Sequence, residues 1–302
     1  MRLTGAPLVA LALLCALAPA HAADSDLAKY HFGRETTPSP QSPAAIGSYS
    51  RGCLAGAEAL PADGPAFQAM RLSRNRRWGH PVLVSFVEEL AAASPALGLN
   101  GLLVGDLSQP RGGSMLTGHT SHQVGLDADF WFADMPEPRL TEAERETIPF
   151  LSMLTEDRSA VATERFTEPF AKLLRHAAAD ARVARIFIHP LLKRSLCAWE
   201  APEADRAWLS KIRPWYGHDA HFHVRLNCPA GARACRGQRP PPDGDGCGAP
   251  LDYWFTDEPY TPDPNARKKL PLTLARMPRA CRNLLSATVP RPRPPRRARP
   301  DN

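Results

Sequence analysis

The sequence of 302 residues lacks a hydrophobic run long enough to cross a bilayer, a C-x-x-C pair and a broad excess of charge. A spanning helix needs roughly 20 apolar residues, and no segment reaches that length, so we do not expect a membrane-spanning chain. Without C-x-x-C pairs, the common cysteine-based zinc motifs are absent. The net charge of +6 falls near +1 once Arg2 (+1) and the tail from Pro290 (+4) are set aside. The body of the chain is therefore not expected to bind nucleic acid.

The first 22 residues are typical of an export signal. Arg2 supplies the positive start, residues 8–17 are apolar, and Ala20-His21-Ala22 matches a cleavage site. The alternative is an uncleaved anchor helix, but the apolar stretch is short for one. We expect cleavage after Ala22 and a mature, exported chain that begins at Ala23.

Six cysteines remain after Cys15 leaves with the signal. They are Cys53, Cys197, Cys228, Cys235, Cys247 and Cys281. An even number of cysteines in an exported chain predicts disulfides, with zinc ligation as the alternative. Only Cys228 and Cys235 are close in sequence, and proximity favours that pair.

The two ends of the mature chain differ in composition from its middle. Residues 23–44 are polar and rich in Ser and Pro, which predicts a flexible arm. Residues 288–302 form a basic, Pro-rich tail that we expect to be disordered. The tail is either a solvated end or a segment that adheres to an anionic polymer.

Periodic segments between these ends predict a mixture of helices and strands. Apolar residues at helical spacing predict amphipathic helices over residues 82–90 and 170–177. Residues 102–104 and 183–188 have the apolar, branched composition of strands. Residues 240–248 are expected to form a loop pinned through Cys247.

Histidine is concentrated in two short segments. Five of the ten histidines fall within residues 118–129 and 215–226. They are His119, His122, His218, His221 and His223. Imidazole nitrogens and carboxylate oxygens are ligands that Zn²⁺ prefers, and the first segment also contains Asp127 and Asp129. The clustering predicts a hydrolytic metal centre, and the alternative is a histidine-rich patch without metal.

Both segments alternate as strands do. Asp127 and Asp129 share one face of the first, and His221 and His223 share one face of the second. An acidic pair on one strand face is costly unless it is solvated, paired or bound to a metal. The histidine spacing lets one ring bind the metal while the other addresses a metal-bound water.

The order His122-x6-Asp129 followed by His221-x-His223 resembles the superfamily of lysostaphin, D-Ala-D-Ala metallopeptidases and sonic hedgehog. It is most similar to the penicillin-insensitive murein endopeptidases. The similarity covers residues 45–287, the expected zinc metallopeptidase domain. It extends through Ile46-Gly47-Ser48, Gly52-Cys53, Trp78-Gly79-His80-Pro81, Gly118 to Asp129, Arg185-Ile186-Phe187, His218 to Leu226 and Gly244 to Gly248.

The resemblance implies that His122, Asp129 and His223 hold Zn²⁺, with water in the position that catalytic zinc leaves open. His119 is similar to an additional metal-side histidine of the family, and the alternative is a loop histidine bonded to solvent or backbone. His221 is the expected general base, which takes a proton from the water and later assists the leaving amine. His218 is expected to orient or assist the transition state, unless it is a surface histidine beside the ligands.

Other polar residues are expected to have structural roles. Asp127 is expected to hold a ligand imidazole in its tautomer, and Asp219 to be a turn residue. Some family members carry an Asp-x-x-His pair mid-chain, but here Asp157 is followed by Ala160, so no second metal is predicted. We assign no site role to His31, His80, His176 and His189. The resemblance also implies the disulfides Cys53–Cys281, Cys197–Cys247 and Cys228–Cys235.

The expected fold is α+β, with a small antiparallel sheet that carries the zinc site in a groove, flanked by helices and disulfide-pinned loops. The resemblance implies a periplasmic zinc endopeptidase that hydrolyses D-alanyl–meso-diaminopimelyl cross-links of peptidoglycan. Insensitivity to β-lactams follows, because no serine is acylated. The alternatives are a D,D-carboxypeptidase of the same superfamily and a non-catalytic cell-wall or zinc-binding module.

Overall fold

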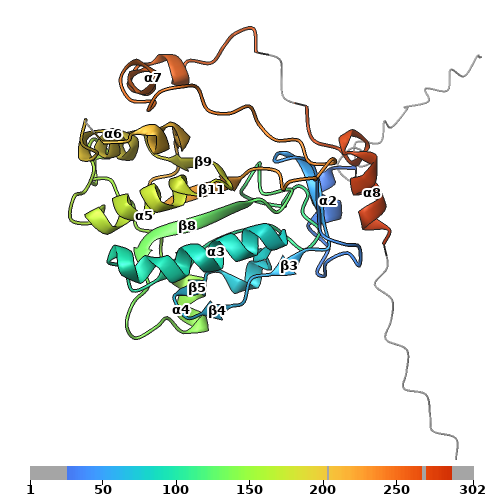
Figure 1. Ribbon diagram of the computed structural model, residues 1–302. Helices are drawn as coiled ribbons and strands as arrows, with labels where there is room; N and C mark the ends of the chain where they lie inside the picture. The colour runs from blue at the N-terminus through green and yellow to red at the C-terminus, as the bar shows by residue number, and fades with distance from the viewer. Residues whose placement is uncertain (1–25, 203, 267–269, 288–302) are drawn as a thin grey trace, which may run out of the picture.

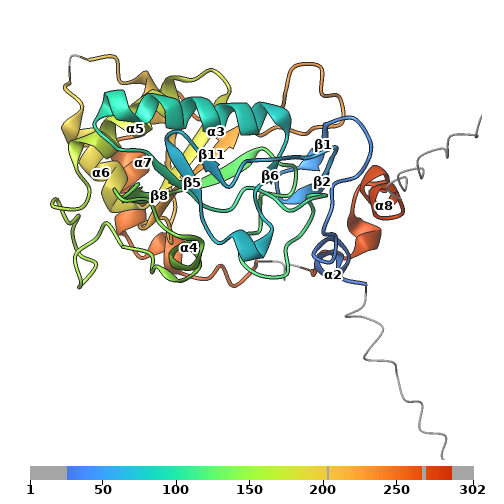
Figure 2. The same cartoon turned by 90° about the horizontal axis from the view of Figure 1, so that it is seen from below.

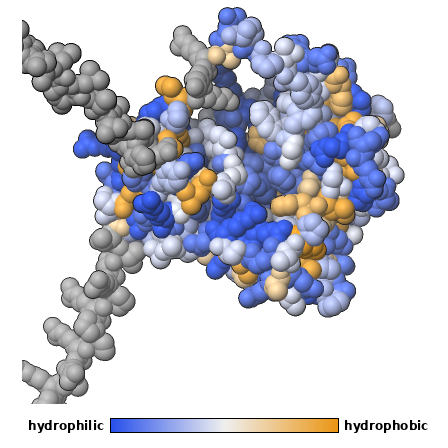
Figure 3. Space-filling view, turned by 180° about the vertical axis from the view of Figure 1, so that it is seen from behind, coloured by the Kyte–Doolittle hydropathy of each residue, from blue (hydrophilic) through white to orange (hydrophobic). Residues whose placement is uncertain are grey.

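The structure is a computed structural model that describes residues 26–202, 204–266 and 270–287. The signal peptide expected over residues 1–22 and the tail expected over residues 288–302 lie outside the described residues. No helix in the described ranges is long and apolar enough to span a membrane. The face in Figure 3 is mostly hydrophilic, with hydrophobic residues in small separate groups.

A seven-stranded sheet forms the centre of the molecule, in the order β10-β9-β11-β8-β7-β5-β4. Its strands are β4 (Asp63–Gly64), β5 (Phe67–Ala69), β7 (Leu102–Val104), β8 (Asp127–Asp134), β9 (Val183–Ile188), β10 (Ile212–Pro214) and β11 (His221–Leu226). The four central strands are antiparallel, whereas β10 pairs with β9, and β5 with β7, in parallel. The α+β class is confirmed, with a sheet that is larger and more mixed than expected.

Helices α3 (Pro81–Ala93) and α5 (Glu168–Ala179) lie along one face of this sheet (Figure 2). Their apolar stripes, including Phe86 and Leu173, bury against strand residues that alternate toward them. Phe130 of β8 and Phe222 of β11 stack there with ring centres 5.0 Å apart. The alternation that buries these rings turns the charged residues of β8 and β11 to the opposite face.

Shorter elements surround this layer. They are β1 (Ala44–Ser48), β2 (Arg51–Ala55), β3 (Glu58–Ala59), β6 (Trp78–Gly79), α4 (Glu142–Thr147), α6 (Pro190–Trp199) and α7 (Ala249–Asp252). The expected helices over 82–90 and 170–177 lie within α3 and α5, and the expected strands over 102–104 and 183–188 have the same bounds as β7 and β9.

Two of the histidines without an assigned site role cap helices. His80 precedes Pro81 at the start of α3, and its Nδ1 accepts a hydrogen bond from the Val82 amide at 3.3 Å. His189 precedes Pro190 at the start of α6 and accepts from the Leu191 amide at 3.2 Å. Each ring satisfies an amide that the first turn of a helix leaves unpaired, while proline occupies the position that needs no amide.

The two ends of the described chain pack against each other (Figure 1). Helix α2 (Ala28–Phe32) lies within the segment expected to be a flexible arm, and its Phe32 is fully buried beside α8 (Arg279–Leu285). The disulfide Cys53–Cys281 lies in the same cluster. This part of the arm therefore differs from the expectation, because apolar residues spaced along a polar segment bury against the opposite end of the chain.

The six cysteines form three disulfides, and their pairing is the one that the resemblance implied. Cys53 bonds to Cys281, Cys197 to Cys247, and Cys228 to Cys235. The second bond ties the loop before α7 to α6. The pairing leaves none of the six cysteines available as a zinc ligand.

Candidate metal centre

Strands β8 and β11 bring the two histidine-rich segments together. Their antiparallel register pairs Asp129 with His223, and Asp127 with Arg225. Because side chains alternate, these four residues lie on the face of the sheet away from α3 and α5. The sheet register thus joins positions almost one hundred residues apart into a single buried cluster.

Three donor atoms form a nearly equilateral triangle at this position. The distances are 3.2 Å from His122 Nε2 to His223 Nδ1, 3.4 Å from His122 Nε2 to Asp129 Oδ1, and 3.3 Å from His223 Nδ1 to Asp129 Oδ1. Ligand atoms about 2.0–2.1 Å from one tetrahedral ion are about 3.3 Å apart. The triangle therefore has the dimensions of one face of a tetrahedral metal site.

His122 reaches this triangle from the loop before β8. Its backbone has φ of 66°, a left-handed conformation that is uncommon for residues other than glycine. The Asp127 carboxylate accepts a hydrogen bond from the His122 amide at 3.1 Å, and His122 Nδ1 contacts the Leu107 carbonyl. With Nδ1 directed at a carbonyl, the Nε2 atom faces Asp129 and His223. Backbone strain of this kind persists where surrounding contacts hold it, and functional sites are a common place for it.

The Asp129 carboxylate has one oxygen, Oδ1, that lacks a hydrogen-bond donor within the described part of the chain. The atom is buried and has no hydrogen-bond partner among the described residues. Burial raises the pKa of this carboxyl group, but the neighbouring rings of His122 and His221 outweigh burial and hold the pKa well below its usual value. An ionised, buried oxygen without a donor is costly, and a cation within the triangle would satisfy it.

The pKa values of His122 and His223 are shifted in opposite directions. Burial lowers the pKa of His122, but the carboxylates of Asp129, Asp127 and Asp106 together outweigh burial and raise the pKa above its usual value. Burial dominates at His223 and lowers its pKa to about 4. His223 is therefore neutral near pH 7, with one ring nitrogen free to act as a ligand.

Asp127 determines which ring nitrogen of His223 carries the proton and which is free to act as a ligand. His223 Nε2 donates to Asp127 Oδ1 at 2.8 Å, so the proton lies on Nε2 and the lone pair of Nδ1 faces the triangle. Arg225 Nε also donates to Asp127 Oδ1, at 2.6 Å, and this contact helps to hold the pKa of Asp127 below its usual value despite burial. Asp127 thus contacts the imidazole of His223, the residue that the resemblance implies as a ligand.

His119 lies at the rim of the triangle. Its Nε2 is 3.4 Å from Asp129 Oδ2 and 3.1 Å from Asp106 Oδ2. His119, His122 and Asp129 together form a group whose ligand atoms could hold a metal ion. Arg76 also donates to Asp106 Oδ2, at 2.9 Å. His119 therefore has a carboxylate partner of its own, which differs from the alternative of a loop histidine bonded to solvent or backbone.

His221 and His218 border the triangle on another side. His221 Nε2 is 4.0 Å from Asp129 Oδ1, and the rings of His218 and His221 have centres 4.9 Å apart. His218 Nδ1 lies 3.0 Å from the Tyr216 carbonyl, which fixes the ring. Burial, together with the neighbouring His221, lowers the pKa of His218 to about 4. The imidazoles of His218 and His221 therefore lie beside the triangle without forming part of it.

A small pocket opens over this cluster. It is lined by Arg71, Arg74, Gly105, Asp106, His119, Asp129, Trp131, Phe150 and His221. The Arg71 guanidinium lies 5.4 Å from the centre of the Trp131 ring and 5.8 Å from that of Phe150. Phe150 is 47% exposed, so the pocket has an apolar, accessible wall beside the polar cluster.

Sequence reasoning missed three residues of this region. Arg225 continues the alternation of His221 and His223 along β11, a signal that could have identified it. Asp106 follows β7 without a pattern of its own, and only the fold brings it to His119. Asp219 lies in the bend before β11, in keeping with the turn residue that we expected, but its buried carboxylate also pairs with Arg158 at 3.2 Å and with Ser152, contacts that the sequence did not predict.

The comparisons with known proteins agree over most of the chain. The family model for penicillin-insensitive murein endopeptidase matches residues 45–286. Proteins of that name from Klebsiella pneumoniae and Escherichia coli K12 are each 40% identical, over 92% and 93% of this chain and 98% of their own lengths. The Haemophilus influenzae protein of that name is 43% identical over 80% of this chain and 82% of its own length. This chain therefore belongs to the penicillin-insensitive murein endopeptidase family.

Proposed function

We propose that the protein is a periplasmic zinc endopeptidase that hydrolyses the D-alanyl–meso-diaminopimelyl cross-links of peptidoglycan. Family membership supports a peptidase that acts on murein. One observation supports a metal-dependent reaction above all others. His122, Asp129 and His223 place three donor atoms in a triangle, and one corner is the Asp129 oxygen that lacks a hydrogen-bond partner in the described ranges. Two imidazoles and a carboxylate are a donor set that suits zinc and leaves a position open.

Zinc held by these three groups would lower the pKa of water to about 7 and polarise the scissile carbonyl. His221 borders the same position with its Nε2 4.0 Å from the Asp129 carboxylate. In the proposed reaction His221 removes the proton of the attacking water and returns it to the leaving amine. His218 is neutral near pH 7, because burial lowers its pKa to about 4, and it donates or accepts a hydrogen bond in the transition state without adding charge.

His119 lies beside the triangle and, with His122 and Asp129, could also contribute to holding a metal ion. Its contact with Asp106 fixes the ring, and Arg76 anchors that carboxylate in turn. We assign His119 to the metal side of the site, where it either provides a further ligand or hydrogen-bonds to the Asp129 carboxylate. In the proposed complex the peptide cross-link enters the pocket lined by His119 and His221, with the exposed Phe150 ring against its apolar parts.

The expected export signal and the disulfides support the periplasmic assignment. The first 22 residues have the composition of a cleaved signal, and the three disulfides need an oxidising compartment. Protein recovered from the periplasm should begin at Ala23. Recovery of protein that still begins at Met1 would contradict this part of the proposal.

The proposed reaction is tested with purified, zinc-loaded protein on isolated peptidoglycan. We expect release of uncross-linked muropeptides, loss of the activity in a chelator and its return with zinc. Conversion of cross-linked dimers to monomers identifies the endopeptidase, whereas trimming of linear pentapeptides alone identifies a D,D-carboxypeptidase. Binding to peptidoglycan without any cleavage would identify a non-catalytic module and overturn the proposal.

A further inference from the structure

A row of aromatic rings leads away from the metal centre. The ring centre of His223 is 5.2 Å from that of Phe187, which is 6.3 Å from that of Trp215. Trp215 in turn lies 5.9 Å from Trp254, in the segment that follows α7. The metal triangle and the α7 segment are therefore connected by a continuous series of ring contacts, although they are far apart in sequence.

The outer part of this row is exposed to solvent. Trp215 is 54% exposed and Tyr260 is 52% exposed. A cavity of about 450 Å³ is lined in part by Tyr216, Trp254 and Tyr260, and the Trp215 ring contacts Trp254 without lining the cavity itself. Large apolar rings exposed next to a hollow need an explanation, because they add nothing to the stability of the core. We call Trp215, Tyr216, Trp254 and Tyr260 the aromatic platform.

The rings of the platform are held in place before any ligand binds. The hydroxyl groups of Tyr216 and Tyr260 both donate to the carbonyl oxygen of Trp254. The Tyr216 and Tyr260 rings contact each other with centres 4.6 Å apart. On the neighbouring residue Phe255, the Arg194 guanidinium lies 3.3 Å from the ring centre. A rigid surface of this kind loses little conformational entropy when it binds a ligand.

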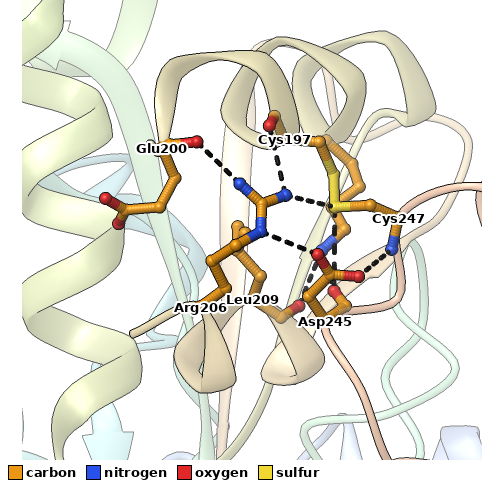
Figure 4. The surroundings of a disulfide bond; sticks show 7 residues. Cys197, Glu200, Arg206, Leu209, Asp245 and Cys247 are labelled. Carbon is orange, nitrogen blue, oxygen red and sulfur yellow. Dashed lines mark hydrogen bonds and ion pairs between the residues drawn. A yellow bond between two sulfur atoms is a disulfide. The ribbon is translucent and has the colours of Figure 1, made fainter. Parts of the chain in front are cut away.

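A disulfide and two side chains hold the loop before α7 against α6 and the segment that follows α6 (Figure 4). Cys247, two residues before α7, is bonded to Cys197 of α6. Arg206 Nε donates to the Asp245 carboxylate at 2.8 Å, and the buried Lys193 Nζ donates to the Asp245 carbonyl at 2.7 Å. These contacts fix the loop that leads into α7, and hence the position of Trp254 and Tyr260 relative to the metal centre.

We propose that the aromatic platform binds the sugar rings of a peptidoglycan glycan strand, while the attached stem peptide reaches the metal centre. This proposal rests on the proposed function. The apolar C–H face of a pyranose ring packs against an aromatic face, and indole and phenol groups hydrogen-bond to hydroxyls at the rim. Among the described residues, no group accepts a hydrogen bond from the exposed Trp215 indole N–H, so it is available for a sugar hydroxyl.

The charges of the cavity favour a sugar over a stem peptide as the occupant. A stem peptide carries carboxylates and requires unpaired cations for its recognition. Among the described residues that line this cavity, Arg158 is the one guanidinium, and it pairs with Asp219 at 3.2 Å. His189 also lines the cavity, but burial lowers its pKa and it is neutral near pH 7. Asp257 is the other charged residue of this described lining, and its carboxylate would repel the carboxylates of a stem peptide but can accept a hydrogen bond from a sugar hydroxyl. A ring-lined hollow without an unpaired cation among its described residues suits an uncharged sugar ring.

The test compares two substrates with the same cross-linked peptide, one with its disaccharides attached and one freed of sugars by an amidase. Trp215→Ala and Tyr260→Ala remove exposed rings of the platform, and Tyr30→Ala on α2 is the matched control. We expect the ratio of kcat/KM for the sugar-bearing dimer to that for the sugar-free dimer to fall about tenfold in each platform variant. The Tyr30→Ala ratio should equal that of the wild type.

A second measurement uses an oligomer of N-acetylglucosamine, the uncharged sugar of the glycan strand, and needs no catalysis. Titration calorimetry should detect binding to the wild type and to Tyr30→Ala, with about tenfold weaker binding to Tyr260→Ala. An unchanged kcat/KM ratio, or equal binding by all three proteins, would overturn the proposal and leave the peptide as the occupant. Hydrolysis of the sugar-free dimer by the wild type is independent of this result, so failure of the platform is distinguishable from failure of the proposed function.

Discussion

His223 Nδ1 lies 3.3 Å from Asp129 Oδ1, because the register of β11 against β8 pairs these two residues directly. Neither side chain has to bend toward the other, since both project from the same face of neighbouring strands. His122 completes the triangle from a loop whose geometry depends on Asp127 in the same sheet. The rigid sheet therefore determines most of the metal-site geometry before a cation binds.

The first prediction separates the proposed metal ligands from the proposed general base. His223→Ala and Asp129→Ala each remove one corner of the triangle and should abolish both zinc binding and muropeptide release. His221→Ala should retain zinc near one ion per chain but lose activity by at least about 100-fold, because proton transfer would be unassisted. Elemental analysis and a peptidoglycan digestion assay on the same preparations measure the two properties.

His176→Ala, an exposed histidine on α5, is the control for loss of an imidazole. It should behave as the wild type in both assays. If His221→Ala kept full activity, another group would have to be the base. If it lost zinc together with activity, His221 would be a ligand.

The second prediction concerns Asp127, which orients His223 without belonging to the triangle. Asp127→Asn removes the charge that holds the Nε2 proton of His223 and pairs with Arg225. We expect zinc affinity to fall by about 10–100-fold, as is typical when the partner of a ligand histidine is removed. Asp134→Asn, at the end of the same strand, is the control and should leave zinc affinity unchanged. Competition against a chromogenic chelator gives both affinities, and equal values would refute the orienting role.

The sequence was sufficient to predict much of this site because its signals are local. Alternation along β8 and β11 placed Asp127 with Asp129 and His221 with His223, and the structure has each pair on one face. Helical spacing likewise predicted α3 and α5. Pattern reasoning succeeds where a few neighbouring residues determine which face is buried.

Long-range packing could not be predicted in this way. The segment 23–44 has a polar composition, yet Phe32 and Ala28 bury against α8 from the other end of the chain. The outer parallel strand pairs depend on connections that no local pattern reveals. Asp106 reaches His119 only because β7 lies beside β8 in the sheet. Each of these features depends on contacts between residues far apart in sequence.

The third prediction compares two disulfides. Cys53–Cys281 spans 228 residues, whereas Cys228–Cys235 spans 7. In the chain-entropy account the longer loop stabilises the fold by about 5 kcal/mol and the shorter by about 2 kcal/mol. Replacing both cysteines of the first pair by alanine should therefore lower the free energy of unfolding by about 3 kcal/mol more than the same change in the second. Urea unfolding of the two variants measures the difference, and similar losses would show that residual structure already keeps the two ends of the unfolded chain close together.

The fourth prediction concerns the two histidine caps and the pH dependence of stability. Burial lowers the pKa of His80 and of His189 in the folded state, so below about pH 6.5 the unfolded chain binds more protons than the folded chain. Stability contributed by the neutral rings is thus complete above that pH and is lost as the pH falls, by at most about 1.4 kcal/mol per pH unit for each ring. The double variant His80→Asn, His189→Asn keeps a capping acceptor that does not titrate and should reduce this slope, while His176→Asn controls for the number of histidines. Urea unfolding between pH 7.5 and 5 measures the slopes, and a double variant as acid-sensitive as the wild type would show that other groups cause the loss.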